Sequence, residues 1–428
     1  MNIRETILEQ NSHWYKEKRQ IKFVLRDIAD QIKLKSNFIE VITGPRRSGK
    51  STIFNILIDQ IIKSGQAEQK EILLLNFDNP NFIPFYKNVA KLDEIIQVAE
   101  VLAGNKIKYL FLDEIQNIEI WEKWVKAKYD QKIFKKIFIT GSNSNLLTGQ
   151  YISRLSGRFF EHMNLPFSFS EFLKSQKIEY FQDEAKNYPK KNKIISLFNQ
   201  YLEQGGFPEV SISGDKEILK IYYQTILLKD VIDNNKIRDS YNLKHIALFL
   251  ISNIAGFYSF NKIGKELDIH ENTVKEYIEY LNNSFLFMDL KKYDPSVRKQ
   301  NKNKRKIYCV DNGLVSQIGF KFSSDSGHFL ENLVAVELKR RGQEIFYHNA
   351  KHECDFLIKD GRNIVQAIQV CYEINNKNKN REYKGLLEAM AFHRLKKGFI
   401  ITNNQEDNIF ENKMNIILIP AWKWLLSN

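Results

Sequence analysis

The sequence predicts an α/β fold whose N-terminal part alternates β-strands with helices. A helical region with a winged helix and a C-terminal α/β domain are expected to follow. Three observations support this prediction. Residues 44–52 form a glycine- and lysine-containing loop between a β-rich run, residues 38–43, and a helix-like run, residues 52–63. A second apolar run stops at Asp113 and Glu114, and a length of 428 residues allows two or three domains.

Charge and composition limit the class of partner. The formal net charge is +13 and the sequence pI is about 9.2, so an anionic partner is expected, with nucleic acid as the first candidate. A lysine-rich surface also serves solubility, and charge alone leaves the two interpretations equal. No stretch approaches the ~18 apolar residues of a membrane span, and the charged N-terminus is unlike a signal peptide. The few cysteines, Cys309, Cys354 and Cys371, form no zinc pattern and suit a cytoplasmic protein.

The loop after the first strand, residues 44–52, fits G-x-x-x-x-G-K-[ST] at every fixed position and is called the phosphate loop below. Such a loop points backbone N–H groups at phosphate oxygens, and the helix that follows directs its positive end at the same anion. Lys50 is expected to reach the β- and γ-phosphates of ATP, and the Ser51 hydroxyl to hold Mg²⁺. A plain surface loop is the competing interpretation, which the flanking strand and helix disfavour. The predicted nucleotide-binding residues are Gly44, Pro45, Arg46, Arg47, Ser48, Gly49, Lys50, Ser51 and Thr52.

The strands that follow supply the rest of the predicted site. Residues 71–77 form an apolar strand and residues 91–102 a helix-like segment. The next strand ends at Asp113, which is expected to hold Mg²⁺, and Glu114, which is expected to orient or deprotonate an attacking water. A solvated acidic turn is the alternative, and the preceding phosphate loop argues against it.

A third strand, residues 136–140, ends in polar residues. Either Ser142 or Asn143 is a candidate contact for the γ-phosphate or the attacking water, although both residues also suit a simple turn. Arg158 follows in a Ser-Gly-Arg motif before a last strand, residues 159–165. It could act as an arginine finger, in cis or in trans, or equally form a structural salt bridge.

The segments GPRRSGKST, LDEIQ, TGSNS, LSGRF and LPFSFSEFL, in this order, resemble the AAA+ class of P-loop ATPases. These sequence segments are similar to those of one prokaryotic branch of the class, whose members carry a C-terminal domain of unknown function. The resemblance implies a parallel sheet with helices on both faces and with an additional strand between the phosphate-loop strand and the strand that ends at Asp113. It also implies Mg²⁺ binding by Ser51 and Asp113, water activation by Glu114 and γ-phosphate sensing by Asn143 or Ser142.

The sequence pattern in the middle of the chain predicts a helical connector between two domains. Gly205, Gly206 and Pro208 break a helical pattern, and residues 218–235 look helical. Residues 259–290 have the apolar spacing of a helix-turn-helix followed by a β-hairpin, which predicts a winged helix. A packing or dimerising unit has the same spacing.

A basic run follows this predicted winged helix. Such a cluster can contact phosphates without reading sequence, or can be a solvated hairpin tip. Its basic residues are Lys291, Lys292, Arg298, Lys299, Lys302, Lys304, Arg305 and Lys306.

The C-terminal segment resembles the restriction-endonuclease-like fold, in which acidic groups hold Mg²⁺ and a lysine positions water. Asp355 matches the Asp of the motif, Gln369 its Glu/Gln position, and Glu331 the upstream helical acid. Cys371 stands at the lysine position, and a neutral thiol cannot replace an ammonium. The sequence therefore predicts a degenerate, inactive nuclease fold.

Together these patterns predict an ATPase domain at residues 1–200, a connector with a winged helix at 201–315 and a nuclease-like domain at 316–428. The first functional hypothesis is Mg²⁺-dependent ATP hydrolysis coupled to nucleic-acid binding. The second is a nucleotide-gated switch that recruits a protein partner, and the third, which Cys371 argues against, is an ATP-gated nuclease. A homo-oligomer is a further expectation.

Overall fold

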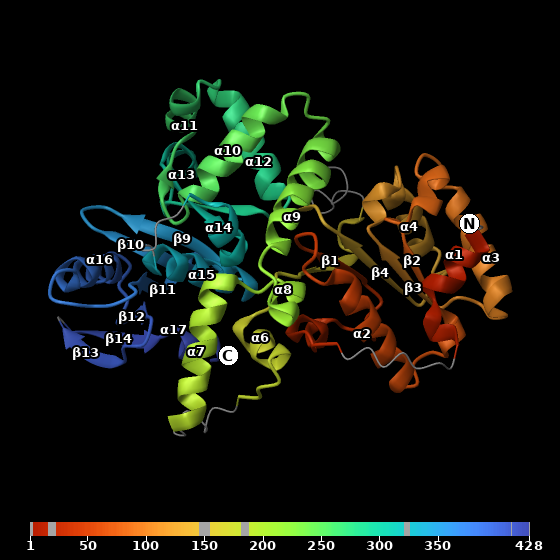
Figure 1. Cartoon of the computed structure of the whole chain (residues 1–428), viewed down its shortest axis with the longest axis horizontal. Helices are drawn as coiled ribbons and strands as arrows, with labels where there is room; N and C mark the ends of the chain where they lie inside the picture. The colour runs from red at the N-terminus through yellow and green to blue at the C-terminus, as the bar shows by residue number, and fades with distance from the viewer. Residues whose placement is uncertain are drawn as a thin grey trace. The chain divides into compact units, whose positions relative to one another are not determined.

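The computed structural model describes residues 3–15, 23–144, 155–180, 188–320, 326–411 and 413–427. The chain forms two compact units, Met1–Asn164 and Leu165–Asn428, whose elements are labelled in Figure 1. The region predicted as a connector and the C-terminal sheet therefore belong to one unit. The predicted three-domain division stays a prediction.

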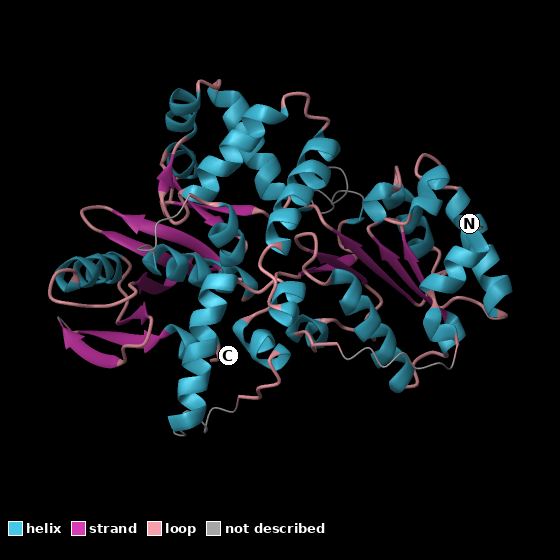
Figure 2. Ribbon diagram, viewed as in Figure 1, coloured by secondary structure: helices cyan, strands magenta, loops and turns pink. Residues whose placement is uncertain are grey.

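The first unit is built on a five-stranded sheet, drawn in magenta in Figure 2, with the strand order β2-β3-β4-β1-β5. Every neighbouring pair in this sheet is parallel. Strand β4 lies between β1, which precedes the phosphate loop, and β3, which ends at Asp113, as the resemblance implied. The strands are β1 (Ile39–Thr43), β2 (Ile72–Asn76), β3 (Tyr109–Asp113), β4 (Lys136–Gly141) and β5 (Phe159–Met163).

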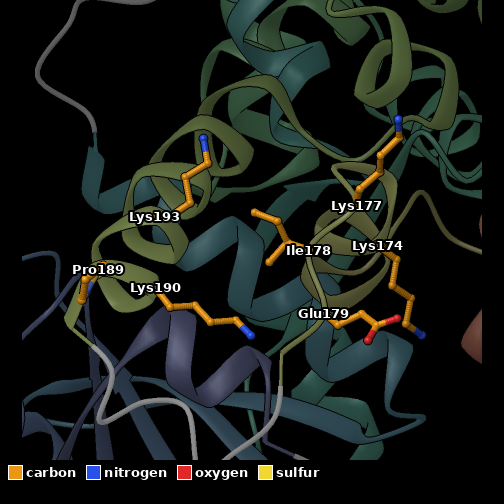
Figure 3. A pocket seen from close by; sticks show the side chains of 7 residues that line it. All are labelled: Lys174, Lys177, Ile178, Glu179, Pro189, Lys190 and Lys193. Atoms are coloured by element: carbon orange, nitrogen blue, oxygen red, sulfur yellow. The ribbon is translucent and has the colours of Figure 1, made fainter.

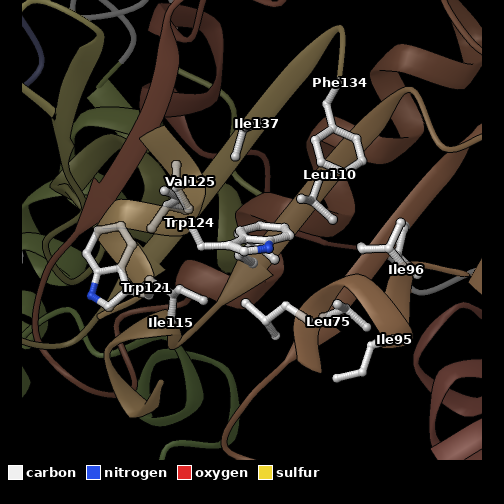
Figure 4. Packing of buried hydrophobic residues seen from close by; sticks show 14 of the residues in the cluster. Leu75, Ile95, Ile96, Leu110, Ile115, Trp121, Trp124, Val125, Phe134 and Ile137 are labelled. Carbon is white, nitrogen blue, oxygen red and sulfur yellow. The ribbon is translucent and has the colours of Figure 1, made fainter. Parts of the chain in front are cut away.

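Helices cover both faces of this sheet because apolar residues alternate between the two faces along each strand. Leu110 packs in one buried cluster with side chains of α3 and α4, part of which Figure 4 shows. Phe111, the next residue, packs in a second cluster with Phe54 of α2. The helices of this unit are α1 (Ile3–Gln10), α2 (Lys50–Lys63), α3 (Lys91–Ala103) and α4 (Trp121–Asp130), with short 3₁₀ turns between them. The predicted α/β class is confirmed.

The second unit begins with helices, and the predicted helical segment at residues 218–235 is confirmed as α9 and the π-helix η8. These elements are α6 (Phe169–Ser175), α7 (Tyr188–Gln204), α8 (Pro208–Ser213), α9 (Ile218–Thr225), η8 (Ile226–Asp233) and α10 (Ser240–Ser252).

A three-stranded antiparallel sheet with the order β6-β8-β7 follows α10. Two helices, α11 and α12, lie between β6 and β7 in sequence, and Asp268 ends α11 in the left-handed conformation with φ of 55°. The bounds are β6 (Phe257–Tyr258), α11 (Phe260–Leu267), α12 (Glu271–Asn283), β7 (Phe287–Lys291), α13 (Val297–Lys302) and β8 (Arg305–Cys309). The basic run therefore contains a short helix, α13, as well as the two strands.

The C-terminal sheet is mixed and has the order β13-β14-β12-β11-β10-β9. Strands β9, β10 and β11 pair antiparallel, whereas β11, β12 and β14 pair parallel, and α16 connects β11 to β12. The elements are α14 (Asn312–Ile318), α15 (Ser326–Arg340), β9 (Glu344–Asn349), β10 (Glu353–Asp360), β11 (Asn363–Val370), α16 (Lys379–Phe392), β12 (Lys397–Thr402), β13 (Asp407–Glu411), β14 (Met414–Pro420) and α17 (Ala421–Leu425). Within the described residues, no helix combines the length and the apolar character needed to cross a membrane.

Candidate active site

The phosphate loop, the acidic pair and the polar residues after β4 meet at one edge of the first sheet. Strands β1, β4 and β3 are neighbours, and Thr43 pairs with Gly141 while Leu112 pairs with Ile139. Because parallel strands end at the same edge of a sheet, the loops that follow these three strands come together. The strand order thus assembles residues that are about 100 positions apart in the sequence.

The glycines of the loop are required by its backbone. Gly44 has a φ of 150°, and a Cβ atom there would lie 2.0 Å from the carbonyl oxygen of Asn164. Gly49, with φ of 94°, precedes the first residue of α2 in the left-handed conformation that glycine adopts readily. The side chain of Asn164 donates to the Ser48 carbonyl oxygen at 3.0 Å, and Arg26 Nη1 donates to the same oxygen at 2.7 Å. Sequence patterns did not indicate these two supports of the loop.

Lys50 points into the loop that precedes it. Its side chain is buried, and Nζ donates to the carbonyl oxygens of Gly44 at 3.1 Å and Pro45 at 3.2 Å. The same nitrogen lies 3.5 Å from Glu114 Oε1. The ammonium is therefore held at the centre of the loop, between its backbone and the acidic pair.

Ser51 and Asp113 form a direct contact. Ser51 Oγ donates to Asp113 Oδ2 at 2.7 Å, and the Thr140 hydroxyl donates to the other carboxylate oxygen. Burial and the neighbouring Glu114 carboxylate raise the pKa of Asp113 to about 6, so the group is mainly ionised at neutral pH. A hydroxyl and a carboxylate this close are oxygen ligands of the kind that Mg²⁺ prefers.

Glu114 is placed by its backbone and by Thr140. Its φ is 53°, an uncommon value for a residue with a side chain, and its N–H donates to Thr140 Oγ1 at 3.0 Å. Gln116 Nε2 donates to Glu114 Oε2, while Oε1 faces Lys50. Thr140 thus contacts both acidic residues, a role that its place inside an apolar strand did not reveal.

The remaining predicted residues fall into two groups. Ser142 and Asn143 are buried directly after β4, beside the phosphate loop. Arg158, in contrast, precedes β5, and its carbonyl oxygen accepts the N–H of Ile39 at the first residue of β1. Arg158 therefore lies at the opposite edge of the sheet from the loop, where Nε donates to Asp130 Oδ1 at 2.9 Å. The structure does not bring Arg158 to the loop of its own chain, because the length of β1 and β5 separates them.

The four residues predicted for the degenerate nuclease site do come together. Glu331 on α15, Asp355 on β10, and Gln369 and Cys371 at the end of β11 line one pocket of about 760 Å³. Gln369 Oε1 accepts the N–H of Asp355 at 3.3 Å. Burial and the nearby Glu382 carboxylate raise the pKa of Cys371 to about 11, so its thiol is neutral. The sequence placed Lys306 of β8 in the basic run, but the residue is buried, and its Nζ lies 2.8 Å from both Glu331 Oε1 and Asp355 Oδ1 in this pocket.

A second pocket of the same unit, of about 780 Å³, is basic. Figure 3 shows its lining, which comes from the end of α6, the residues after it and the start of α7. Its lysines are Lys174, Lys177, Lys190 and Lys193.

Comparison with protein families divides the chain into three matched segments. A family model described as an AAA domain matches residues 36–173. Two models described as domains of unknown function, DUF8612 and DUF4143, match residues 195–325 and 326–424.

Two curated relatives match most of the chain. An uncharacterized protein of Methanocaldococcus jannaschii is 34% identical over 433 residues, which cover 96% of this chain and 92% of the relative. An uncharacterized protein of Haemophilus influenzae is 33% identical over 349 residues, which cover 79% of this chain and 84% of the relative.

Solved structures that the comparison found include the Aeropyrum pernix Orc1 protein in complex with DNA, at 10% identity and a TM-score of 0.31 over 68% of this chain and 87% of that one. AMPPCP-bound DnaA from Aquifex aeolicus is 14% identical, with a TM-score of 0.29 over 60% and 86% of the two chains. TM-scores of this size carry no argument about function.

Proposed function

Because this chain belongs to the same family as the uncharacterized proteins of M. jannaschii and H. influenzae, and an AAA-domain model matches residues 36–173, we propose that it binds ATP with Mg²⁺ and hydrolyses it. The observation that carries the proposal is the meeting of Lys50, Ser51 and the Asp113–Glu114 pair at one edge of the parallel sheet. A surface loop of the same composition would not be expected to face two buried carboxylates.

The loop and helix α2 are the proposed phosphate cradle. Lys50 exchanges its contacts with the Gly44 and Pro45 carbonyl oxygens for contacts with phosphate oxygens. Backbone N–H groups of the loop and the positive end of α2 face the same phosphates. Lys50 thereby neutralises negative charge that develops on the transferred phosphoryl group.

Ser51 and Asp113 are the proposed protein ligands of the magnesium ion. Held there, Mg²⁺ would supply positive charge that offsets the negative charge of the phosphates. Among the described residues, no cluster of three or more His, Cys, Asp or Glu side chains suited to a metal occurs.

Glu114 is the proposed residue that orients or deprotonates the attacking water. Thr140 fixes its backbone, and Lys50 and Gln116 fix its two carboxylate oxygens. Ser142 or Asn143, after β4, is the proposed contact of the γ-phosphate. A role for Arg158 in hydrolysis would require a neighbouring copy of the chain, since it lies at the far edge of its own sheet.

We further propose that turnover is coupled to nucleic-acid binding. The elements α11, α12, β7 and β8 have the order of a winged helix, and α13 adds positive charge between the two strands. Arg298, Lys299, Lys302 and Lys304 are exposed there, whereas Arg305 pairs with Asp289 at 2.7 Å. Phosphate contacts from such a surface give affinity without sequence specificity.

A nucleotide-gated switch is the second candidate. It is favoured by the engagement of both Glu114 oxygens, by Lys50 and Gln116, because these contacts compete with an attacking water for the carboxylate. Such a protein would change shape with ATP and recruit a protein partner.

One experiment separates the two candidates. ATP hydrolysis is measured for the wild type and Lys50→Ala, each with and without single- and double-stranded DNA, at low and moderate salt. Turnover that DNA raises, that salt weakens and that Lys50→Ala abolishes is the expected result. Turnover that is indifferent to DNA would favour the switch, and tight ATP binding without turnover would contradict hydrolysis itself.

A further inference from the structure

The pocket of the C-terminal domain holds a charge arrangement that the ATPase proposal does not use. A nuclease of the fold that the sequence resembles needs a divalent metal on its acidic residues. Here Glu331 and Asp355 would have to supply that site, because Gln369 carries no charge. The contacts of these two carboxylates therefore decide whether a metal fits.

Both carboxylates are bound to Lys306. Its Nζ lies 2.8 Å from Glu331 Oε1, 2.8 Å from Asp355 Oδ1 and 2.5 Å from Glu353 Oε1. Three carboxylate oxygens thus converge on the Lys306 ammonium. As they stand, the described acidic side chains form no group of three that could hold a metal ion. Only 2% of the Lys306 side chain is exposed to solvent.

The position of Lys306 is fixed by strand pairing. Lys306 lies in the middle of the β6-β8-β7 sheet, paired with Phe257 on one side and Leu290 on the other. Its Nζ lies 5.4 Å from the centre of the Phe257 ring. The lysine is therefore built into a sheet and is not a mobile surface side chain.

The Lys306 ammonium is engaged by all three acidic side chains. It donates hydrogen bonds to Glu331 Oε1 and Asp355 Oδ1 and forms an ion pair with Glu353. Asp355 Oδ2 accepts the N–H of Val370 at 2.9 Å, and Glu331 Oε1 also accepts the Tyr308 hydroxyl at 2.7 Å. Burial opposes the charge on Lys306, but Asp355 and Glu331 outweigh it and hold the lysine pKa well above its usual value. The ammonium therefore stays protonated and is already engaged by three acidic side chains.

We propose that Lys306 is the resident cation of this pocket and takes the place of the divalent metal that the fold would otherwise bind. A metal could enter only by displacing a buried, fully paired ammonium, which would then face it at short range. The pocket accordingly binds no Mg²⁺ or Mn²⁺ and supports no metal-dependent cleavage. Once the Lys306 charge is removed, the same carboxylates are free to turn toward a divalent metal.

Mn²⁺ binding, followed by electron paramagnetic resonance without added nucleotide, tests this inference. The Asp113→Asn background weakens the proposed metal site of the ATPase domain, so the two sites stay distinguishable. With Lys306 present, no bound Mn²⁺ that depends on Asp355 is expected. Lys306→Met should gain one Mn²⁺ site, which a further Asp355→Asn substitution removes. Lys304→Met, an exposed neighbour, is the matched control and should gain none.

Two results would overturn the inference. One is Mn²⁺ bound to the chain with Lys306 intact and lost on Asp355→Asn, or DNA cleavage that shows the same dependence. The other is a folded Lys306→Met variant that gains no Mn²⁺ site. Lys306→Met leaves three carboxylates without a counter-ion, so its thermal midpoint is measured with and without Mn²⁺, and a rise confined to this variant is expected. The wild-type measurement needs no variant at Lys306 and tests the inference even if Lys306→Met fails to fold.

Discussion

The N–H of Gly206 donates a 2.7 Å hydrogen bond to Asp311 Oδ2, across 105 positions of the sequence. This bond joins the glycine break after α7 to the turn after β8. The N–H of Gly313 donates to the other oxygen of Asp311 at 2.9 Å. The buried Asp311 carboxylate thus ties two loops of the second unit together, which gives both motifs a structural role.

Gly205 has no room for a side chain at this junction. Its φ is 75°, and a Cβ atom would lie 1.9 Å from Asp311 Oδ1. Gly205→Ala should therefore lower the free energy of unfolding by more than about 3 kcal/mol, as a buried clash adds to the strain of a left-handed backbone. Gly214, with φ of 76° and open space within 4 Å of the position that a Cβ atom would take, is the matched control. Gly214→Ala should cost about 1–2 kcal/mol in urea denaturation, and equal losses for the two variants would contradict the argument.

Lys50→Ala should abolish ATP turnover, because it removes the cation at the centre of the phosphate loop. A loss of at least ~100-fold is expected, in line with electrostatic groups of this kind. Lys63 ends the same helix with 79% of its side chain exposed, so Lys63→Ala is the control and should leave turnover unchanged. The check is steady-state phosphate release by both variants. Comparable rates for both would remove Lys50 from the mechanism.

Thr140→Val should reduce turnover even though Thr140 is proposed to touch no phosphate. The substitution keeps the shape of the side chain but removes the hydroxyl that donates to Asp113 and accepts the Glu114 N–H. If the misplaced carboxylates stabilise the transition state by about 1–3 kcal/mol less, kcat should be ~10- to 100-fold lower. Thr140→Ser retains the hydroxyl and should restore most of the rate. If Thr140→Val and Thr140→Ser have the same turnover, the side chain of Thr140 contributes only to packing.

Turnover should fall as the pH drops through about 6, the raised pKa of Asp113. A protonated carboxyl is a poor ligand for Mg²⁺, so the affinity for metal and nucleotide should weaken in parallel. The same shift has the opposite effect on stability. A carboxyl whose folded pKa is raised stabilises the fold below its ordinary pKa of 3.8, and this contribution disappears as the pH rises through about 6.

Protonation of Asp113 does not destabilise the fold, so unfolding caused by this group would not explain a loss of turnover in acid. A pH profile of kcat/KM, with circular dichroism at each pH, provides the check. A profile that stays flat across pH 6 while the protein remains folded would show that the ionisation of Asp113 is not needed.

Neutralising the exposed basic residues around α13 should weaken DNA binding. The four residues are Arg298, Lys299, Lys302 and Lys304, and removing each ion pair with a phosphate should lower the salt slope of the affinity by about 0.9. Replacing the four lysines of the basic pocket in Figure 3 with alanine is the comparison, and should leave binding unchanged. Fluorescence anisotropy over a salt series measures both. If only the substitutions in the basic pocket weaken DNA binding, the nucleic-acid interface lies at α6 and α7.

Local patterns in the sequence were sufficient to predict the α/β class, the phosphate loop and the acidic strand end. Gly44, Gly49 and Lys50 occupy positions that a single loop backbone dictates, and Asp113 stands where an apolar strand stops. The C-terminal motif also named Glu331, Asp355, Gln369 and Cys371, which line one pocket because neighbouring strands and a packed helix position them.

Only the tertiary structure decided which distant side chains complete these sites. Asn164 supports the phosphate loop from the end of β5, Thr140 joins the acidic pair from β4, and Lys306 enters the C-terminal pocket from a different sheet. The same strand order that gathers the loops at one edge leaves Arg158 at the other. These contacts depend on strand order and packing between segments far apart in the chain, which local periodicity does not encode.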